Sequence, residues 1–390
     1  MIKLATRMSR LGTESAFEVL ARARALEAQG REIVHLEIGE PDFDTPPHII
    51  EAACEALRSG ATHYTPSAGI PQLRAAIAEE ISRTRNQPVD AAQVVVTPGA
   101  KPIMFFIIMA LAEEGTEVIY PNPGFPIYES MINFVGAKAV PLPLREERDF
   151  RFDVNELKDL ITDRTRLIIL NSPQNPTGGI LEREDLAAIA EICVQRDIPV
   201  LADEVYEHIL YDGTFESIAT FPGMSTTERT IILHGFSKTY AMTGWRLGYG
   251  VMPVPLADHV TRLMTNSNSC TSASTQFAGV AALKGPQDSV GEMVAAFRQR
   301  RDLIVDGLNS LPGVTCVKPR GAFYVFPNIR DTGMDSHTAE AFFMDRAGVA
   351  CLSGAAFGEY GEGYLRLSYA NSLENIQKAL DNMRRALEDR

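Results

Sequence analysis

The chain has 390 residues, which is too long for one ordinary domain and suits two domains that share an interface. Hydrophobic residues make up 45% of it and charged residues 22%, as in an ordinary globular protein. The 37 basic and 50 acidic side chains give a formal charge of −13. This acidic excess argues against nucleic acid or an anionic membrane surface as a partner.

The cysteines and the apolar runs bear on the compartment. The five cysteines are far apart, odd in number and form no Cys-x-x-Cys pair, so we expect neither a disulfide framework nor a metal site. No apolar segment of signal-peptide length follows the N-terminal charges. The apolar run at residues 102–112 is only about half as long as a bilayer crossing needs. These features favour a cytoplasmic protein.

The N-terminal part of the chain predicts a helix and then a short extended segment. The helical pattern covers residues 13–30, with Phe17 and Leu20 among the apolar residues on one side. Residues 33–38 predict an extended segment that ends at Gly39. From about residue 48 the pattern is helical again.

The middle of the chain alternates short apolar runs with longer amphipathic ones. The predicted strands are residues 93–97, 117–120, 166–170, 200–203, 230–233 and 247–251. The predicted helices between them include residues 101–112 and 183–196. This alternation indicates a mainly parallel sheet covered by helices on both faces. Ligands of such sheets bind beyond the C-terminal strand ends. Four candidate site residues fall at or just after such ends: Gly99, Asn175, Asp203 and Lys238.

Past about Gly285 the pattern changes to long helices with few strands. Residues 293–311 predict a helix, and residues 321–327 predict a strand. A final helix has one apolar stripe, formed by Leu373, Ile376, Leu380, Met383 and Leu387. This part of the chain predicts a smaller α+β domain.

One lysine and one arginine, Lys238 and Arg246, lie between the last two predicted strands of the middle region. A lysine amine forms a Schiff base with an aldehyde cofactor only when it is partly deprotonated, which a desolvated pocket beside positive charge promotes. Arg246 is a plausible source of that charge, and its planar fork suits a phosphate dianion. On their own, a lysine and an arginine near two strands would more often be solvated surface charges.

Four segments together carry a resemblance to a known family. They are Gly-Glu-Pro-Asp-Phe-Asp-Thr-Pro at 39–46, Asn-Ser-Pro-Gln-Asn-Pro-Thr-Gly at 171–178, Ala-Asp-Glu-Val-Tyr at 202–206 and Ser-Lys-Thr-Tyr-Ala-Met-Thr-Gly-Trp-Arg-Leu-Gly at 237–248. In this order and spacing they resemble the class I pyridoxal-phosphate aminotransferases, the aspartate aminotransferase-like group of fold type I. The resemblance covers essentially the whole chain.

The resemblance implies an α/β fold and a domain organisation. A large cofactor-binding domain at residues 46–284 would hold a mainly parallel seven-stranded sheet between helices, and residues 285–390 would form the smaller α+β domain. Residues 1–45 would pack with the small domain. Tyr64 matches a family tyrosine that reaches the phosphate bound by the neighbouring subunit, so the resemblance also implies a homodimer with shared active sites.

The resemblance assigns catalytic roles around pyridoxal 5′-phosphate. Lys238 would anchor the cofactor and then move the substrate proton, and Asp203 would keep the pyridine nitrogen protonated. A buried acid at a strand end needs such a cationic partner, although Asp203 could instead be a helix N-cap. Tyr206 and Asn175 would donate hydrogen bonds to the ring oxygen. The family also implies a cis peptide between Asn175 and Pro176.

The phosphate would lie where a predicted strand gives way to a helix. The amides of Gly99-Ala100-Lys101 open that helix and suit an anion, and Ser237 and Arg246 would complete the cradle. Many relatives carry a serine where this chain has Gly235, which puts one hydroxyl contact in doubt. Phe125 stands where many relatives stack an aromatic ring on the cofactor, although it could also be a core residue.

Arg366 matches the arginine that holds the substrate α-carboxylate by a bidentate pair. Ile38 and Gly39 belong to a segment that closes over the substrate in relatives. Residues 265–276 contain no lysine or arginine, so the distal arginine of the animal-type aspartate enzymes has no equivalent there. Lys101 stands where a bacterial subgroup binds the distal carboxylate, unless it lies on its helix without touching substrate.

These observations predict a pyridoxal-phosphate aminotransferase that works by a ping-pong mechanism through pyridoxamine phosphate. Aspartate or glutamate is the favoured amino donor, and a neutral or aromatic donor stays open. A carbon–sulfur lyase on the same fold would share every anchor residue, because the pocket decides which bond breaks. A noncatalytic cofactor-binding protein is the third alternative.

Overall fold

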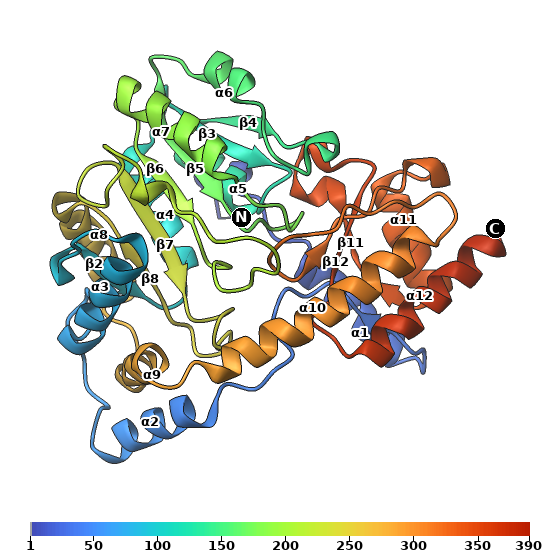
Figure 1. The fold of residues 1–390 in the computed structure, drawn as a ribbon, viewed down its shortest axis with the longest axis horizontal. Coiled ribbons are helices and arrows are strands. Elements are labelled where there is room, and N and C mark those ends of the chain that lie inside the picture. The colour runs from blue at the N-terminus through green and yellow to red at the C-terminus, as the bar shows by residue number, and fades with distance from the viewer. Residues whose placement is uncertain (1) are drawn as a thin grey trace.

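The computed structural model describes residues 2–390 and is organised around one seven-stranded sheet (Figure 1). In spatial order its strands are β2 (Val94–Thr97), β8 (Gly248–Val251), β7 (Thr230–Gly235), β6 (Val200–Asp203), β5 (Thr165–Asn171), β3 (Glu117–Asn122) and β4 (Lys138–Pro143). Strand β8 runs antiparallel to both of its neighbours, β2 and β7, and every other neighbouring pair is parallel. The predicted mainly parallel sheet is therefore confirmed.

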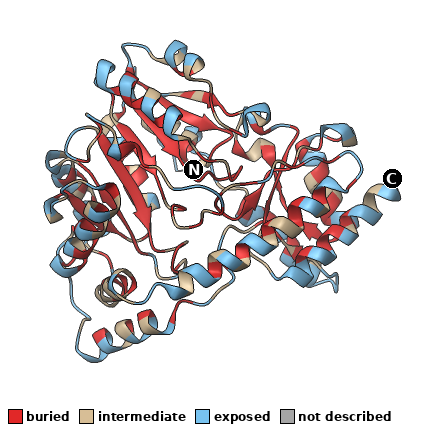
Figure 2. Ribbon diagram, in the orientation of Figure 1, coloured by how far each residue is buried: buried red, intermediate tan, exposed pale blue. Residues whose placement is uncertain are grey.

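Six of the seven strands were predicted, and β4 was not. It begins at exposed Lys138 and contains Pro141 and Pro143, so it lacks the near-continuous apolar run of the other strands. Proline is tolerated there because β4 is an edge strand that pairs only with β3. The inner strands are buried along almost their whole length, as Figure 2 shows.

Helices cover both faces of the large sheet. Hydrophobic residues of α4 (Lys101–Leu111), α5 (Ile127–Val135) and α8 (Val254–Ser267) pack on one face. The other face is covered at one end by α6 (Val154–Leu160) and α7 (Arg183–Arg196), and at the other by α2 (Pro47–Arg58), α3 (Pro71–Arg85) and α9 (Ala273–Lys284). Val95 faces the first layer while Val94 and Val96 face the second, as strand alternation requires.

The C-terminal part contains a second core around a three-stranded antiparallel sheet. Its strands are β11 (Leu352–Ser353), β12 (Leu365–Ser368) and β9 (Tyr324–Val325), and its helices are α10 (Asp288–Asn309), α11 (Ser336–Phe342), a π-helical turn (Phe343–Ala347) and α12 (Leu373–Glu388). In α12 the predicted stripe is buried at Ile376, Leu380 and Met383, while Leu373 is exposed.

The N-terminal segment packs against this C-terminal part. Strand β1 (Val34–His35) pairs in parallel with β10 (Val349–Ala350), and α1 (Ala16–Glu27) lies beside them (Figure 1). Short 3₁₀ segments complete the fold at Thr6–Arg10, Ala91–Gln93, Glu146–Arg148, Ile218–Thr220, Arg330–Thr332, Gly354–Phe357 and Glu359–Gly361.

The predicted apolar side of α1 is not its buried side. Ala16, Val19 and Ala23 belong to the same hydrophobic cluster as α6 and α7 and are buried, whereas Phe17 is 63% exposed. The small residues allow α1 to lie close to its neighbours, and the larger Phe17 and Leu20 line a cavity instead. Among residues 2–390, no helix combines the length and apolar character needed to cross a membrane.

Candidate active site

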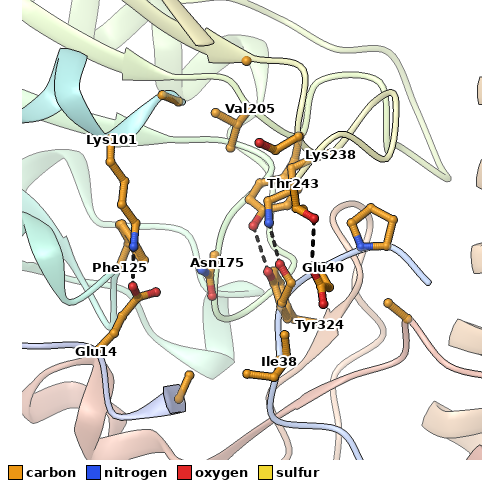
Figure 3. A pocket seen from close by; sticks show the side chains of 18 of the residues that line it. Glu14, Ile38, Glu40, Lys101, Phe125, Asn175, Val205, Lys238, Thr243 and Tyr324 are labelled. Atoms are coloured by element: carbon orange, nitrogen blue, oxygen red, sulfur yellow. Dashed lines mark hydrogen bonds and ion pairs between the residues drawn. The ribbon is translucent and has the colours of Figure 1, made fainter. Parts of the chain in front are cut away.

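A cavity of about 890 Å³ opens at the C-terminal ends of β5, β6 and β7 (Figure 3). It is lined by residues of the N-terminal segment, the large sheet and the C-terminal part. Twelve of the predicted site residues line it: Ile38, Gly39, Ala100, Lys101, Phe125, Asn175, Asp203, Tyr206, Ser237, Lys238, Arg246 and Arg366. Gly99 lies next to the lining, and Tyr64 does not reach it.

Lys238 follows the end of β7 by three residues and points into the cavity (Figure 3). Its amine donates a hydrogen bond to the Gly39 carbonyl. Burial, and after it the positive charge of Arg366, lower the pKa of Lys238 to about 8. The prediction that Arg246 supplies the nearby charge is wrong, because Arg366 is the cation that acts most strongly on this amine.

Asp203 is the last residue of β6 and is buried. The Tyr128 hydroxyl donates to its Oδ2 at 2.5 Å, and the Val205 amide donates to Oδ1 at 3.4 Å. Burial raises the pKa of Asp203 to about 6, against the opposing effect of these hydrogen bonds. A carboxyl group in this position would be stabilised in its ionised form by a cationic ligand.

Tyr206 and Asn175 both line the cavity and contact residues of the C-terminal part. The Tyr206 hydroxyl is 2.8 Å from the hydroxyl of Tyr324 on β9. The Asn175 side-chain oxygen accepts a hydrogen bond from Arg366 at 3.3 Å, and the peptide between Asn175 and Pro176 is cis, as expected. These contacts tie the ends of β5 and β6 to the C-terminal sheet.

Arg366 is only 5% exposed, yet its charge has no acidic partner within 4.0 Å among residues 2–390. Its guanidinium donates to Asn175 and to the Glu37 carbonyl, and it lies over the rings of Tyr324 and Phe357 at 4.7 and 5.0 Å. The Nε atom is buried without a hydrogen-bond partner. A buried cation with a spare donor suits an anionic ligand.

The Gly99-Ala100-Lys101 segment and Arg246 meet at the start of α4. Gly99 has φ +89°, and a Cβ atom there would come within 2.1 Å of Arg246 Nη2. Only glycine therefore allows the guanidinium to lie so close to this loop. At Gly235, which replaces the family serine, a Cβ would be 3.3 Å from the Leu247 carbonyl oxygen, so a side chain there would be slightly crowded.

Phe125 and Lys101 form the outer side of the cavity. The Phe125 ring lies edge-on to Tyr128, with 5.7 Å between ring centroids. The Lys101 amine is 5.2 Å from the Phe125 centroid and forms an ion pair with Glu14 of the N-terminal segment (Figure 3). On the other side of the cavity, Thr243 donates to the Glu40 carboxylate at 2.8 Å.

Sequence reasoning missed three of the residues that shape this cavity: Glu14, Tyr128 and Tyr324. Tyr128 lies three residues after Phe125, a helical spacing that could have indicated a shared face. Tyr324 and Glu14 carry no such signal, because their contacts join segments far apart in the chain. Tyr64 was predicted, and in this single chain its side chain is 91% exposed.

Glu207, His208 and His234 are clustered closely enough to suggest a metal site. The Gly235 amide donates to His234 Nδ1, however, so a neutral His234 ring carries its proton on Nε2. That atom is 3.6 Å from Glu207 Oε1, and the other Glu207 oxygen is bound by Arg85. The geometry fits a proton donor facing a carboxylate better than a set of metal ligands.

Comparison with solved structures gives the class of protein. Aspartate aminotransferase from Thermus thermophilus, in a structure with maleate, superposes with a TM-score of 0.95 at 36% identity, over 99% of this chain and 100% of that one. A sheet with one antiparallel strand and a lysine beyond the end of β7 is thus the aspartate aminotransferase fold, as the sequence predicted.

The family follows from the sequence comparisons. The family described as aminotransferase class I and II matches residues 31–383, and the chain belongs to it. A probable aspartate/prephenate aminotransferase of Aquifex aeolicus is 41% identical over 99% of both chains. Aromatic-amino-acid aminotransferase 2 of Thermococcus litoralis is 41% identical over 93% of this chain and 94% of that one. The chain is therefore a transaminase, and the lyase alternative finds no support among these relatives.

Proposed function

We propose that this transaminase binds pyridoxal 5′-phosphate at Lys238 and moves the amino group of a dicarboxylic L-amino acid, aspartate or glutamate, to a 2-oxo acid. The observation that carries the proposal is the pair of cations around the Lys238 amine. Arg366 and Lys101 come from different elements, line the same cavity and both lower the pKa of that amine. Two cations around one reactive amine suit a substrate with two carboxylates.

The residues of the cavity fit the cofactor. Arg246 and the start of α4 would hold its phosphate, Asp203 its ring nitrogen, and Tyr206 and Asn175 its ring oxygen. The raised pKa of Asp203 supports this arrangement, because a protonated ring nitrogen is the cation that this buried acid lacks. When bound, pyridoxal phosphate supplies an electron sink for the electrons left at the substrate α-carbon when its proton leaves.

The other steps belong to the chain itself. Arg366 would bind the α-carboxylate with its spare Nε and one Nη donor, which fixes the α-carbon beside the Lys238 amine. With a pKa of about 8, that amine can both accept and return a proton near neutral pH. Ile38 and Gly39 line the same cavity and would help to exclude water from the bound substrate.

The assembly and the compartment are part of the same proposal. We infer a cytoplasmic homodimer in which exposed Tyr64 reaches the phosphate site of the neighbouring subunit. Tyr64 is 91% exposed and does not line the cavity of its own chain, which supports a contact outside this chain.

The substrate class draws support from relatives. The Aquifex relative is named for aspartate and prephenate, and the Thermus structure is described with maleate, which is also a dicarboxylate. The Thermococcus relative is named for aromatic amino acids. An aromatic donor is therefore the second candidate.

The test is the half-reaction of the purified, cofactor-loaded protein with single amino acids, followed by absorbance. Rapid conversion by aspartate and glutamate is expected. Conversion by aromatic or neutral amino acids alone would replace the dicarboxylate proposal, and no conversion by any amino acid would overturn the function.

Replacing Lys101 with methionine tests the distal carboxylate site. A hydrogen bond to a charged group contributes about 1.5–3 kcal/mol, so kcat/KM for aspartate is expected to fall roughly 10- to 100-fold. The value for phenylalanine should stay unchanged or rise. Lys284→Met, which removes an exposed lysine of α9 outside the cavity, is the matched control. An equal loss for both amino acids would contradict a distal role.

Tyr128 is a positioning residue that acts through Asp203. Tyr128→Phe removes the donor to Oδ2, so the pKa of Asp203 should rise further and its ionised form should hold the ring nitrogen less well. We expect the Kd of pyridoxal phosphate to rise about tenfold, with little change in KM for the amino acid. Tyr120→Phe, at a tyrosine that does not line the cavity, is the control. An unchanged Kd would contradict this role.

A further inference from the structure

We propose that Glu14 sets the substrate range of this enzyme by acting as an internal counter-ion for Lys101. The inference rests on the proposed function and deepens it. In this structure the Glu14 carboxylate binds the same ammonium group that a dicarboxylic substrate would use. Glu14 is therefore a competitor of acidic substrates and a charge-neutralising partner for neutral ones.

The position of the ion pair supports a role in specificity. Glu14 and Lys101 both line the cavity, and their side chains approach each other across it from the N-terminal segment and from α4 (Figure 3). The pair is partly shielded, with Glu14 22% and Lys101 49% exposed. The Lys101 amine is also 5.2 Å from the Phe125 ring, which places this ion pair at the edge of the proposed cofactor site.

Each substrate type requires a different state of the pair. The distal carboxylate of aspartate would replace Glu14 on Lys101, so the displaced Glu14 must turn to solvent. An aromatic or aliphatic side chain offers Lys101 no charge, and a bare ammonium beside an apolar group is costly. With a neutral substrate Glu14 would keep its partner, and the outer cavity would carry no net charge.

The same N-terminal segment supplies an apolar surface. Phe17 lies in the first turn of α1, three residues after Glu14, and Leu20 follows it by about one turn; both line the cavity. Phe17 is 63% exposed, so a ligand in the cavity could cover part of its ring. Glu14 and Phe17 would thus serve a neutral aromatic substrate together, while Lys101 serves an acidic one.

The charges of Glu14 and Lys101 also have opposite effects on the Lys238 amine. Glu14 raises and Lys101 lowers the pKa of Lys238. Removing Glu14 leaves the Lys101 charge without its partner, both at the Lys238 amine and at the substrate side chain. An ion pair without this role would behave like an ordinary surface pair, whose loss changes little.

Glu14→Gln tests the inference, with Glu18→Gln on the exposed side of α1 as the matched control. In the half-reaction, kcat/KM is expected to rise about threefold or more for aspartate and to fall about threefold or more for phenylalanine. Opposite changes in the two kcat/KM values are expected if Glu14 competes with acidic substrates for Lys101. Parallel changes for both amino acids, or no change, would overturn the proposal. In a Lys101→Met background, Glu14→Gln should no longer alter the ratio of kcat/KM for aspartate to kcat/KM for phenylalanine, because Glu14 acts through Lys101.

Ligand binding gives a readout that does not depend on turnover. Maleate and 3-phenylpropionate are titrated into the cofactor-loaded protein, and Glu14→Gln should bind maleate more tightly and 3-phenylpropionate more weakly than the wild type. Equal affinities for both proteins would overturn the role of Glu14. If the wild type converts no amino acid, the proposed function fails, and this binding comparison still decides the role of Glu14.

Discussion

Replacing Lys238 with alanine is expected to abolish the half-reaction with every amino acid, lowering its rate by at least about 10⁴-fold. Among the residues described, this is the only lysine amine that lines the cavity and has a pKa lowered to about 8. Alanine would remove both the proposed covalent anchor and the proposed proton carrier. The remaining contacts of Asp203, Arg246 and the start of α4 should still hold pyridoxal phosphate noncovalently.

Two measurements separate these effects. The absorbance of the lysine-linked cofactor should disappear in Lys238→Ala, while equilibrium dialysis should still detect bound pyridoxal phosphate. Lys284→Ala, at an exposed lysine paired with Glu79, should keep both the spectrum and the activity of the wild type. A spectrum identical to that of the wild type in Lys238→Ala would assign the cofactor to another lysine and overturn the proposed site.

The large sheet could be predicted because its inner strands are short, apolar and separated by helices. The helix predictions also hold for residues 101–112 and 183–196, which contain α4 and α7. Strand β4 was not predicted, because an edge strand does not need a continuous apolar run. The buried side of α1 was predicted wrongly, because Ala16, Val19 and Ala23, and not Phe17, pack against the rest of the protein. The boundaries at residues 45 and 284 stay a prediction.

The site could be predicted where function fixes a residue close to a strand end or within a distinctive segment. Asp203, Asn175 and Lys238 are of this kind, and all three line one cavity. The source of charge at Lys238 could not be predicted, because Arg366 is 128 residues away in the chain (366 − 238) and approaches only through the C-terminal sheet. Sequence distance made Arg246 the obvious candidate, but folded geometry decides electrostatic effects.

Asp203→Asn is expected to have opposite effects on the cofactor-free and the cofactor-loaded protein. Without cofactor, burial raises the pKa of Asp203 from 3.8 to about 6, so the folded protein holds a proton that the unfolded chain releases at lower pH. The free energy of unfolding of the wild type should therefore fall by about 3 kcal/mol as pH rises from about 4 to above 6. Asparagine carries no charge, so the variant should not lose this contribution.

Urea unfolding of the two cofactor-free proteins at pH 4.5 and 7.5 tests this expectation. The variant should gain stability relative to the wild type at pH 7.5, and the two should be closer at pH 4.5. A difference that does not change with pH would mean that Asp203 is not a buried acid of raised pKa.

Bound pyridoxal phosphate would reverse the disadvantage of the wild type, because its protonated ring nitrogen would give the Asp203 carboxylate the cation that the cofactor-free protein lacks. Asparagine cannot keep that nitrogen protonated, so we expect the half-reaction of Asp203→Asn to slow by about 10²–10³-fold. The same carboxylate would thus destabilise the cofactor-free protein and stabilise the cofactor-loaded one. Equal rates for variant and wild type would show that the ring nitrogen is bound elsewhere, whereas a slow variant that is also the more stable cofactor-free protein can only be explained by a charge held for its ligand.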